Sequence, residues 1–398
     1  MIPFFDGTLR IFDWTQRTIN DYGNFYYGKS APKWSVTEDA TTPCIRYGEL
    51  YTKFNEKIDR VYSYTNIPTD QLKFSTGREV LVPRVGEDPM DFANCSWLSL
   101  SDVAIGEMIS VYNTEQNPLF VAQYFNALLK KEFAEKVEGG NVSNLYYDRL
   151  LGIPVSFPSV AEQEKIADFF DKLNDIIHAT QRKVTLLKQL KAAYLQQMFP
   201  QARERVPRVR FEGFTELWVL KGADEIFCTV SDKGHCHLPV LSASQKHGMV
   251  LRNEIGIDIK FDSTNTTTYK RVLPGQFVIH LRSFQGGLAY SKIEGITSPA
   301  YTILDFIEKD KQFPKFWVDV LRSDNFIKML ESVTYGIRDG RSISFNDFSI
   351  LKMPYPSHDE QRAIGRFFHS FDSNINDMQS KVNALSKLKS AYLQKMFV

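Results

Sequence analysis

The chain has 398 residues, of which 43% are hydrophobic and 24% charged, and its formal net charge is +1. This length predicts two to three domains, and no run of about 18 apolar residues is present that could span a membrane. The opening, MIPFFDGTLRIFDW, lacks the basic and apolar segments of a secretory signal peptide, and the four cysteines are irregularly placed. We therefore expect free thiols in a reducing cytoplasm. The near-neutral charge neither indicates nor excludes a nucleic-acid partner, because a local basic face can coexist with acidic surfaces.

The first region, residues 1–155, has the pattern of a small α+β domain. Its glycine-bounded run REVLVPRV predicts a strand, and the apolar stretch Leu119–Glu135 predicts a helix. Asn117 and Pro118 resemble part of the N-P-P-[YF] motif of amino-methyltransferases. No glycine-rich cofactor loop accompanies them, so we interpret Asn117 as a helix cap and Pro118 as the first helical residue.

Within this region, Gly23–Ser30 (GNFYYGKS) matches the P-loop pattern G-x-x-x-x-G-K-[ST]. A phosphate-binding loop needs a buried strand before it and a helix that begins at its Lys-Ser pair. The preceding RTINDY is only weakly strand-like, and the following APKW cannot start a helix of useful length. We interpret the match as a coincidence and keep a nucleotide-binding enzyme as the alternative from another functional class.

A long helix is predicted over residues 156–199. Ser159 is followed three residues later by Glu162, which is the capping-box pattern, and apolar residues then recur at steps of three and four. The basic, proline-containing stretch at residues 200–210 follows as a linker between two halves of the chain.

The second region, residues 206–355, also has an α+β pattern but differs from the first in detail. The runs VLPGQFVIHL and LAYSKI predict strands, and Pro314–Glu331 predicts a helix. The run His235-Cys236-His237 would point to alternate faces of a strand, so we expect no metal site there. No catalytic set of residues stands out in either region.

The final segment, residues 356–398, repeats the first long helix. Glu162–Phe199 aligns with Glu360–Phe397 without a gap at an offset of 198, and 18 of the 38 positions are identical. Both copies start with Ser-x-x-Glu and end in nearly the same phrase, AAYLQQMF and SAYLQKMF. Each helix would span about 40 residues, or roughly 60 Å, and a helix with one apolar stripe needs a partner in water.

Two equal helices in one chain predict an intramolecular antiparallel pair around a pseudo-two-fold axis, and the alternative is a coiled coil between two chains. The residues that we expect to pack in this pair or to dock a partner subunit are Ile166, Phe169, Phe170, Leu187, Tyr194, Met198, Ile364, Phe367, Phe368, Leu385, Tyr392 and Met396.

Three features together resemble the specificity subunits of bacterial type I restriction–modification systems, over the whole chain. They are the helix starts EQEKIADFF and EQRAIGRFF, the helix ends LLKQLKAAYLQQMFP and LSKLKSAYLQKMF, and the opening FEGFTELW of the second region. The chain departs from the family only in its shortened, altered N-terminal opening. A coiled-coil scaffold without DNA contact is the further alternative.

This resemblance implies a non-catalytic protein that needs no cofactor and that recognises double-stranded DNA. Residues 1–155 and 206–355 would be target-recognition domains, and each would recognise one half of a bipartite, asymmetric sequence. The helices at 156–199 and 356–398 would set the gap between the halves and dock two methyltransferase subunits, and restriction–translocase subunits would join the complex.

DNA recognition uses basic and amide side chains, often on loops held by a rigid scaffold. We expect Arg282, Arg338 and Arg341 to be the best placed, because they lie in glycine-bounded turns. The full set of candidate DNA contacts is Tyr26, Lys29, Lys33, Arg46, Arg84, Asn141, Ser143, Lys246, Arg252, Lys270, Arg271, Arg282, Gln285, Arg338, Arg341 and Ser342.

Overall fold

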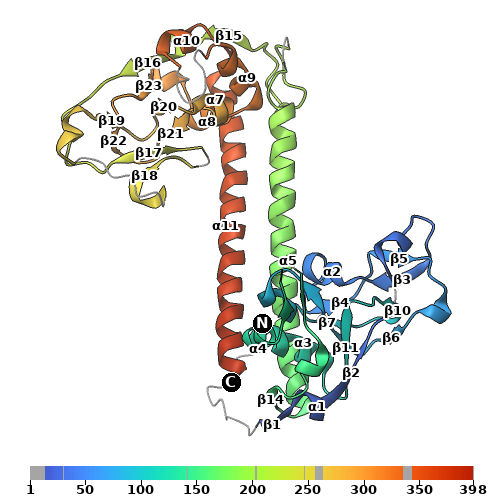
Figure 1. The fold of residues 1–398 in the computed structure, drawn as a ribbon. Coiled ribbons are helices and arrows are strands. Elements are labelled where there is room, and N and C mark those ends of the chain that lie inside the picture. Colours follow the sequence, from blue (N-terminus) through green and yellow to red (C-terminus); the bar gives the residue numbers. More distant parts are fainter. Residues whose placement is uncertain are drawn as a thin grey trace. The chain divides into compact units, whose positions relative to one another are not determined.

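The computed structural model describes residues 14–29, 31–140, 142–201, 204–245, 247–255, 263–334 and 343–397. The chain divides into two compact units, which we call unit 1 (Met1–Ala179 with Lys381–Val398) and unit 2 (Thr180–Ser380). The division cuts through two long helices, α5 (Val160–Gln197) and α11 (His358–Met396), each of which is continuous (Figure 1). Each unit therefore contains one globular region, part of α5 and part of α11.

None of the helices in the described ranges is both long and apolar enough to cross a membrane. The expectation of free thiols is confirmed for all four cysteines, Cys44, Cys95, Cys228 and Cys236.

The globular region of unit 1 is built on a five-stranded sheet with the order β2-β11-β7-β9-β4. Its strands are β2 (Gly23–Tyr27), β4 (Lys57–Ile58), β7 (Glu79–Pro83), β9 (Ser96–Leu98) and β11 (Ile109–Thr114). Neighbouring strands are antiparallel except β4 and β9. Two helices follow the sheet, α3 (Pro118–Leu128) and α4 (Lys130–Glu135), and α3 buries most of its side chains in the core.

Smaller elements complete unit 1. A second sheet has the order β5-β3-β10-β6 and a third the order β12-β13-β8. Their strands are β3 (Thr42–Ile45), β5 (Ser63–Thr65), β6 (Phe74–Thr76), β8 (Val85–Gly86), β10 (Ser101–Ile105), β12 (Glu138–Gly139) and β13 (Ser143–Asn144), and the short helices are α1 (Ile19–Tyr22) and α2 (Tyr47–Thr52).

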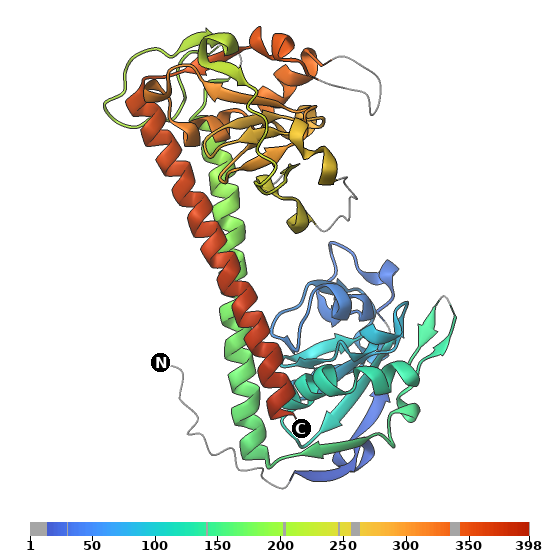
Figure 2. The ribbon, with the colours of Figure 1, turned by 90° about the vertical axis from the view of Figure 1, so that its left-hand side faces the viewer.

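The globular region of unit 2 is built on an antiparallel sheet with the order β16-β23-β20-β21. Figure 2 shows the ribbon of this region from a second side. The region also contains two separate two-stranded sheets, β17-β18 and β19-β22. The strands are β16 (Phe227–Val230), β17 (Leu241–Ser244), β18 (Gly248–Leu251), β19 (Lys270–Val272), β20 (Phe277–Ile279), β21 (Ala289–Tyr290), β22 (Gly295–Thr297) and β23 (Thr302–Phe306). The helices are α6 (Ala223–Ile226), α7 (Ser283–Gly286), α8 (Pro314–Val320), α9 (Asp324–Ser332) and α10 (Phe345–Ser349).

The two globular regions share a framework that their sequences do not reveal. In both, an antiparallel ribbon leads into the long helix: β1 (Thr15–Thr18) with β14 (Pro154–Phe157) in unit 1, and β15 (Val219–Gly222) with β24 (Lys352–Tyr355) in unit 2. In both, three antiparallel strands have the same order across the sheet, with the strand that comes last in the chain in the middle: β2-β11-β7 and β16-β23-β20. The domains are therefore variations on one framework, although the sequence analysis treated them as dissimilar.

The predicted helices after the sheets are each broken in two. The helix expected over Leu119–Glu135 ends at Leu128, and α4 starts afresh at Lys130. The helix expected over Pro314–Glu331 divides into α8 and α9, where Ser323 caps α9 by accepting a hydrogen bond from the Phe326 N–H (3.2 Å). By contrast, the cap at Asn117 is confirmed, because its Oδ1 accepts from the Phe120 N–H at 2.9 Å.

The capping box is only half right in the second copy. The Ser357 hydroxyl does accept a hydrogen bond from the backbone N–H of Glu360 (3.3 Å). The Glu360 carboxylate does not reach back to the cap, because it is buried and takes a two-pronged bond from Arg210 (2.6 and 2.8 Å) and a third from the Trp218 indole (3.0 Å). This glutamate therefore fastens the start of the second domain to α11.

A buried glutamine near the start of each long helix makes the same contacts in both units. Gln163 accepts a hydrogen bond from the Asn117 N–H (2.9 Å), and Gln361 accepts from the Phe313 N–H (3.1 Å). Each amide nitrogen donates to the carbonyl of the proline before its helix, at 2.9 and 3.3 Å. Asn117 and Phe313 are the N-cap residues of α3 and α8, so the repeated glutamine holds the corresponding domain helix in each unit.

The repeated phrase at the helix ends pairs with the start of the other helix. In unit 1 the ring of Tyr392 lies 5.2 Å from that of Phe169, at 81°. In unit 2 the ring of Tyr194 lies 5.2 Å from that of Phe367, at 85°. Because late residues of one helix meet early residues of the other in both units, α5 and α11 are antiparallel in each, which confirms the predicted pair.

A repeated lysine joins the domain to the helices in each unit. In unit 2, Lys191 of α5 lies 2.7 Å from Asp372 of α11 and 3.7 Å from Asp319 of α8. In unit 1, Lys389 occupies the equivalent repeat position on α11 and lies 2.8 Å from Glu56, which immediately precedes β4. Both lysines are mostly buried, and so are Asp319 and Glu56, whereas Asp372 is about half exposed.

Burial, with a smaller contribution from the negative charge of Asp372, raises the pKa of Asp319 to about 7 against the opposing effects of Lys191 and Arg322. The carboxyl group therefore takes up a proton in the folded protein at a pH where the unfolded chain holds it ionised. A raised carboxyl pKa makes the folded state relatively less stable as the pH rises from about 4 to 7.

We expect the substitution Gln163→Leu to lower the free energy of unfolding by about 1–3 kcal/mol, because the N–H of Asn117 loses its acceptor in a buried place. Urea unfolding of the full chain measures the change. The matched control is Gln189→Leu, at an exposed position of the same helix, which we expect to stay within about 0.5 kcal/mol of the parent. Equal losses in the two variants would contradict the role of Gln163.

We expect Asp319→Asn to remove part of the pH dependence of stability. Between pH 5 and 8 the stability of the parent should fall relative to that of the variant, by about 1.4 kcal/mol per unit of pKa shift titrated in that range. Urea unfolding at both pH values measures the difference, with the exposed Asp377→Asn as the control. Parallel pH curves for the parent and Asp319→Asn would refute the prediction.

Candidate nucleic-acid interface

One surface of unit 1 combines cations with tyrosine rings, and we call Tyr26, Tyr27, Lys73, Arg84 and Tyr146 the aromatic–basic cluster. The Lys73 ammonium lies 5.0 Å from the centre of the Tyr26 ring and donates to the Tyr27 carbonyl at 2.8 Å. The Arg84 guanidinium lies 4.7 Å from the Tyr27 ring and 5.9 Å from the Tyr146 ring. Such cation–ring pairs are the chemistry that holds phosphates and stacks on bases.

The positive charge of this cluster comes from Lys73 and Arg84, because tyrosine hydroxyls are neutral at physiological pH. Burial raises the pKa of Tyr26 still further from that range, to about 12. The buried Nε of Arg84 has no hydrogen-bond partner among the described residues, and its Nη1 donates only a long bond of 3.4 Å to the Glu107 carbonyl. The guanidinium is thus positioned by the rings and retains donor capacity.

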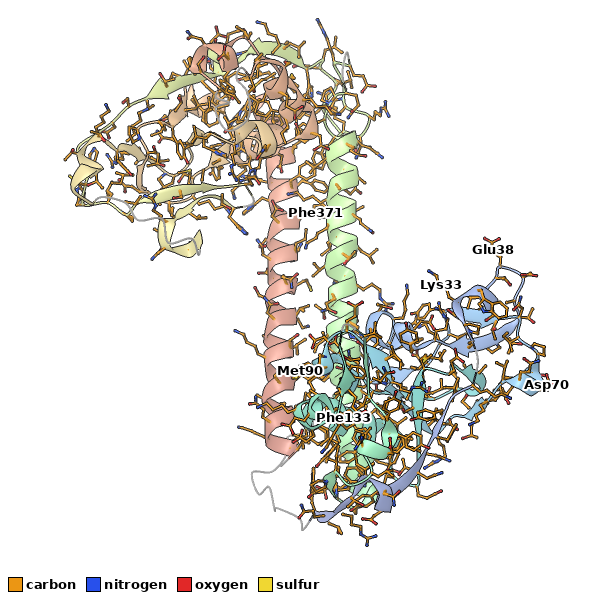
Figure 3. The ribbon with its side chains drawn as sticks, in the orientation of Figure 1. Lys33, Glu38, Asp70, Met90, Phe133 and Phe371 are labelled. Carbon is orange, nitrogen blue, oxygen red and sulfur yellow. The ribbon has the colours of Figure 1, made fainter. Side chains whose placement is uncertain are left out.

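Two predicted lysines, Lys29 and Lys33, are exposed near this part of the chain. Figure 3 shows the Lys33 side chain directed away from the domain, on the same projecting part as Glu38. Trp34 beside it is 71% exposed, which places a large flat ring in solvent next to a cation. A surface of this type suits a nucleic acid better than a neutral solvent face.

The other predictions for unit 1 have different surroundings. Arg46 is half-buried and occupies the N-cap position of α2. Ser143 is 4% exposed, and its hydroxyl donates to the Gly140 carbonyl (3.2 Å), so it is a poor candidate for a DNA contact. Asn141 lies outside the described residues.

The P-loop alternative is wrong. Residues Gly23–Tyr27 form strand β2, which pairs in continuous register with β11. The second glycine of the motif, Gly28, is explained by packing, because a Cβ there would collide with the carbonyl oxygen of Gly106. A paired strand cannot wrap its N–H groups around a phosphate.

In unit 2 a tight turn presents Arg282 and Gln285. Both are exposed, and Gln285 accepts a hydrogen bond from Gln245 (3.1 Å). His280 stabilises this turn. Its backbone N–H donates to the Ser283 hydroxyl (2.9 Å), and its ring Nδ1 accepts from the backbone N–H of Arg282 (3.3 Å). Burial lowers the pKa of His280 to about 4, so the ring is neutral and can accept this bond.

Several other cations of unit 2 are engaged within the domain. Arg271 donates to Glu294 (2.8 Å) and to Asp232 (3.4 Å), and Lys270 donates to the Tyr301 carbonyl (2.7 Å). Arg252 is half-buried. The remaining candidates of this unit, Lys246, Arg338, Arg341 and Ser342, lie outside the described residues.

The residues predicted for helix pairing and docking differ in exposure. Nine of them are buried or half-buried in the cores where helix and domain meet: Ile166, Phe169, Phe170, Tyr194, Met198, Ile364, Phe367, Phe368 and Met396. Of the other three, Leu187 and Leu385 are half-buried and Tyr392 is 37% exposed.

The described ranges contain no group of three or more metal-ligating side chains. His235 pairs instead with Asp232, at 2.8 Å between Nε2 and Oδ1.

Sequence reasoning missed Lys73, Tyr146 and the neighbouring Tyr147 as members of the surface around Tyr27. The Tyr147 ring lies 4.6 Å from that of Tyr27 and stacks on Phe25 at 5.5 Å. The only available signal was the Tyr-Tyr pair in a loop, because strand pairing brings these residues together from distant parts of the chain.

A family model for the type I restriction modification DNA specificity domain matches residues 12–189. Among solved structures, the chain is similar to the type I restriction–modification S subunit from M. genitalium, with 15% identity, 98% of each chain covered and a TM-score of 0.61. The HsdS subunit from Thermoanaerobacter tengcongensis is 14% identical over 97% of this chain and 96% of that one, with a TM-score of 0.47. No curated protein matches the chain in sequence.

A third similar structure concerns the complex assembly and conformational transition of a type I restriction–modification system. It is 14% identical, with 97% of each chain covered and a TM-score of 0.50.

Both units thus carry an α+β domain on parts of one duplicated, antiparallel helix pair. The resemblance to type I restriction–modification specificity subunits is supported by the family model over residues 12–189 and by a similar fold over 98% of the chain.

We expect Arg282→Ala to weaken DNA binding by about 1–3 kcal/mol if the side chain contacts a base, or to lower the salt dependence of binding by about one counterion if it contacts a phosphate. Fluorescence anisotropy with a duplex that carries the methylated target, at several salt concentrations, distinguishes the two. The matched control is Arg271→Ala, whose guanidinium already bonds Glu294 and Asp232 and should affect binding less. A larger effect from Arg271→Ala would reverse this assignment.

Proposed function

We propose that each globular region recognises one half of a bipartite, asymmetric target in double-stranded DNA and directs partner subunits to it. The observation that carries this proposal is the repetition of one helix-and-domain arrangement in both units, with the same glutamine and tyrosine contacts. The same helix contacts below two different domains suit a protein that recognises two different DNA sequences with one architecture. The candidate contacts are the aromatic–basic cluster in unit 1 and the Arg282 turn in unit 2.

The helix pair would act as the spacer between the two half-sites. Helix α5 has 38 residues and α11 has 39, so each is about 57 Å long at 1.5 Å per residue. Because B-DNA rises about 3.4 Å per base pair, a rod of this length exceeds one helical turn of DNA. The target would therefore contain a stretch of bases that the chain does not contact.

Exposed leucines at matching repeat positions support docking of a partner on each helix. Leu190 of α5 is 46% exposed, and Leu388 of α11 is 41% exposed. A repeated apolar position on a repeated helix suits two copies of one partner, and we assign these copies to two methyltransferase subunits. Restriction–translocase subunits would complete the assembly, and we place the complex in the bacterial cytoplasm as a part of defence against foreign DNA.

We expect insertion of four residues into both helices, after Ala179 and after Ser380, to lengthen the gap and leave the half-sites unchanged. Four residues add about 6 Å of helix, close to two base pairs. Methylation mapping in cells that carry the chain and its methyltransferase partner measures the target.

The control for this test is the same insertion in one helix only, which should abolish methylation because the repeated ends no longer meet their partners. An unchanged gap in the double insertion would overturn the spacer role.

A further inference from the structure

The equivalent lysines Lys191 and Lys389 have acid partners from different elements. Lys191 reaches Asp319 in α8, whereas Lys389 reaches Glu56 in the loop before β4. All the carboxylates and ammonium groups of these two contacts are at most 21% exposed. The lysine is thus a common part of the repeated helix, and each domain supplies its own acid.

Helix α3 explains why the acid of unit 1 comes from elsewhere. Counting from the caps Asn117 and Phe313, Gln123 of α3 occupies the position that Asp319 occupies in α8. Gln123 is 2% exposed, its Nε2 donates to the Ala167 carbonyl (3.3 Å), and its Oε1 has no partner among the described residues. With an amide at this position, α3 offers Lys389 no carboxylate.

The acid of unit 1 comes from a short segment before and at the start of β4, which adds polar contacts to the packing of α3. Three successive residues contact α5 or α11: Asn55 lies 3.5 Å from the His178 ring, Glu56 pairs with Lys389, and Lys57 pairs with Asp171 at 2.9 Å. Asn174, the repeat equivalent of Asp372, donates to the second Glu56 oxygen at 3.3 Å. The Glu56 carboxylate therefore bonds both long helices at once.

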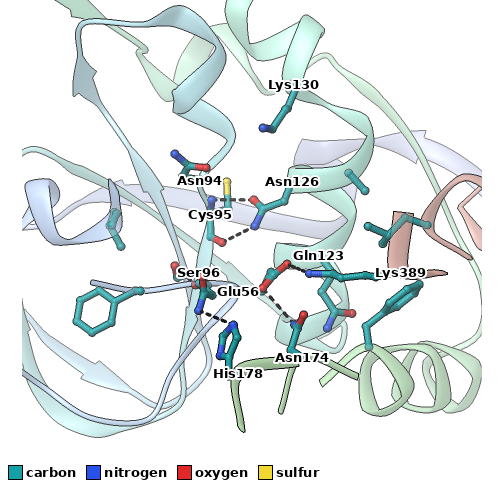
Figure 4. A pocket seen from close by; sticks show the side chains of 16 residues that line it. Glu56, Asn94, Cys95, Ser96, Gln123, Asn126, Lys130, Asn174, His178 and Lys389 are labelled. Carbon is teal, nitrogen blue, oxygen red and sulfur yellow. Dashed lines mark hydrogen bonds and ion pairs between the residues drawn. The ribbon is translucent and has the colours of Figure 1, made fainter. Parts of the chain in front are cut away.

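These groups surround a polar cavity of about 280 Å³ in unit 1 (Figure 4). Gln123, Asn174 and Lys389 all line it, and Figure 4 shows Glu56 between Lys389 and Asn174. Gln123 of α3 and Lys389 of α11 therefore line the same cavity, and an acid at residue 123 would come from the position that α8 uses in unit 2.

We propose that Lys191 and Lys389 are positioning residues, each of which fixes the recognition domain of its own unit on the helices and so sets how faithfully that domain reads its half of the target. This inference rests on the proposed function. Apolar packing holds a domain against a helix but permits small shifts. A buried ion pair contributes little net stability because both charges lose hydration, so the geometric constraint is the role that we assign to these lysines. A shift of about 1 Å at a distant contact can cost a reaction about 100-fold.

The test compares Lys389→Met and Lys191→Met in the full chain, assembled with its methyltransferase partner, by mapping methylated sites in cells. We expect each variant to relax base preference about tenfold or more at one half-site only, with the two variants affecting opposite halves. The controls are Lys387→Met and Lys188→Met, at exposed positions of the same helices. Thermal unfolding of the purified variants verifies that each one folds.

A second experiment does not depend on the lysine variants. Glu56→Gln should relax the same half-site as Lys389→Met, and Gln123→Asp in the same chain should restore the preference, because it supplies the acid from the position used in unit 2. Relaxation of both half-sites together, no relaxation, or no restoration would overturn the proposal. Absence of a bipartite target for the parent chain would instead contradict the proposed function itself.

Discussion

The structure depends on the exchange of two phenylalanines between the copies of the repeated helix. Phe397, the last described residue of the chain, stacks on Phe170 (5.7 Å, 16°) and is 2% exposed in the core of unit 1. Phe199, at the end of α5, stacks on Phe368 (6.0 Å, 22°) in the core of unit 2. Each domain core is completed by the end of the helix that belongs, by repeat, to the other domain. Neither half of the chain contains all of its own core, so both helices must be present for either domain to be complete.

This exchange explains which residues of the repeat are identical and which differ. The identical Gln163 and Gln361 contact parts of the framework that the two domains share, namely the starts of α3 and α8. The identical Lys191 and Lys389 instead pair with acids that each domain supplies from a different element. The repeat position of Asn174 and Asp372 differs because the partners differ. Asn174 donates a hydrogen bond to Glu56 in unit 1, whereas Asp372 pairs with Lys191 in unit 2. The variable position thus lies next to the common contacts. An amide or an acid there changes how the domain is attached, and the stacked rings stay the same.

The long helices could be predicted from sequence because their signals are local and duplicated: a serine start, an apolar stripe and a matching end. The breaks after Leu128 and near Ser323 could not, because neither glycine nor proline marks them and the packing of α3 and α8 decides where they end. The P-loop pattern was matched to the letter by a strand, since a pattern of residue types does not encode strand pairing. Likewise the surface around Arg84 is assembled from loops that only the sheets bring together.

Asp319 indicates that the lysine–acid contacts of the two domains fix the orientation of each domain more than they stabilise it. Burial raises its pKa to about 7 even with Lys191 beside it, so loss of hydration outweighs the attraction of the ion pair. A group selected for stability alone would be replaced by an apolar or amide side chain, as Gln123 illustrates at the equivalent position of α3. An acid that costs stability and yet joins α8 to α5 is consistent with a requirement for a fixed domain orientation. Under the function that we propose, that orientation would decide how the recognition side chains meet the DNA.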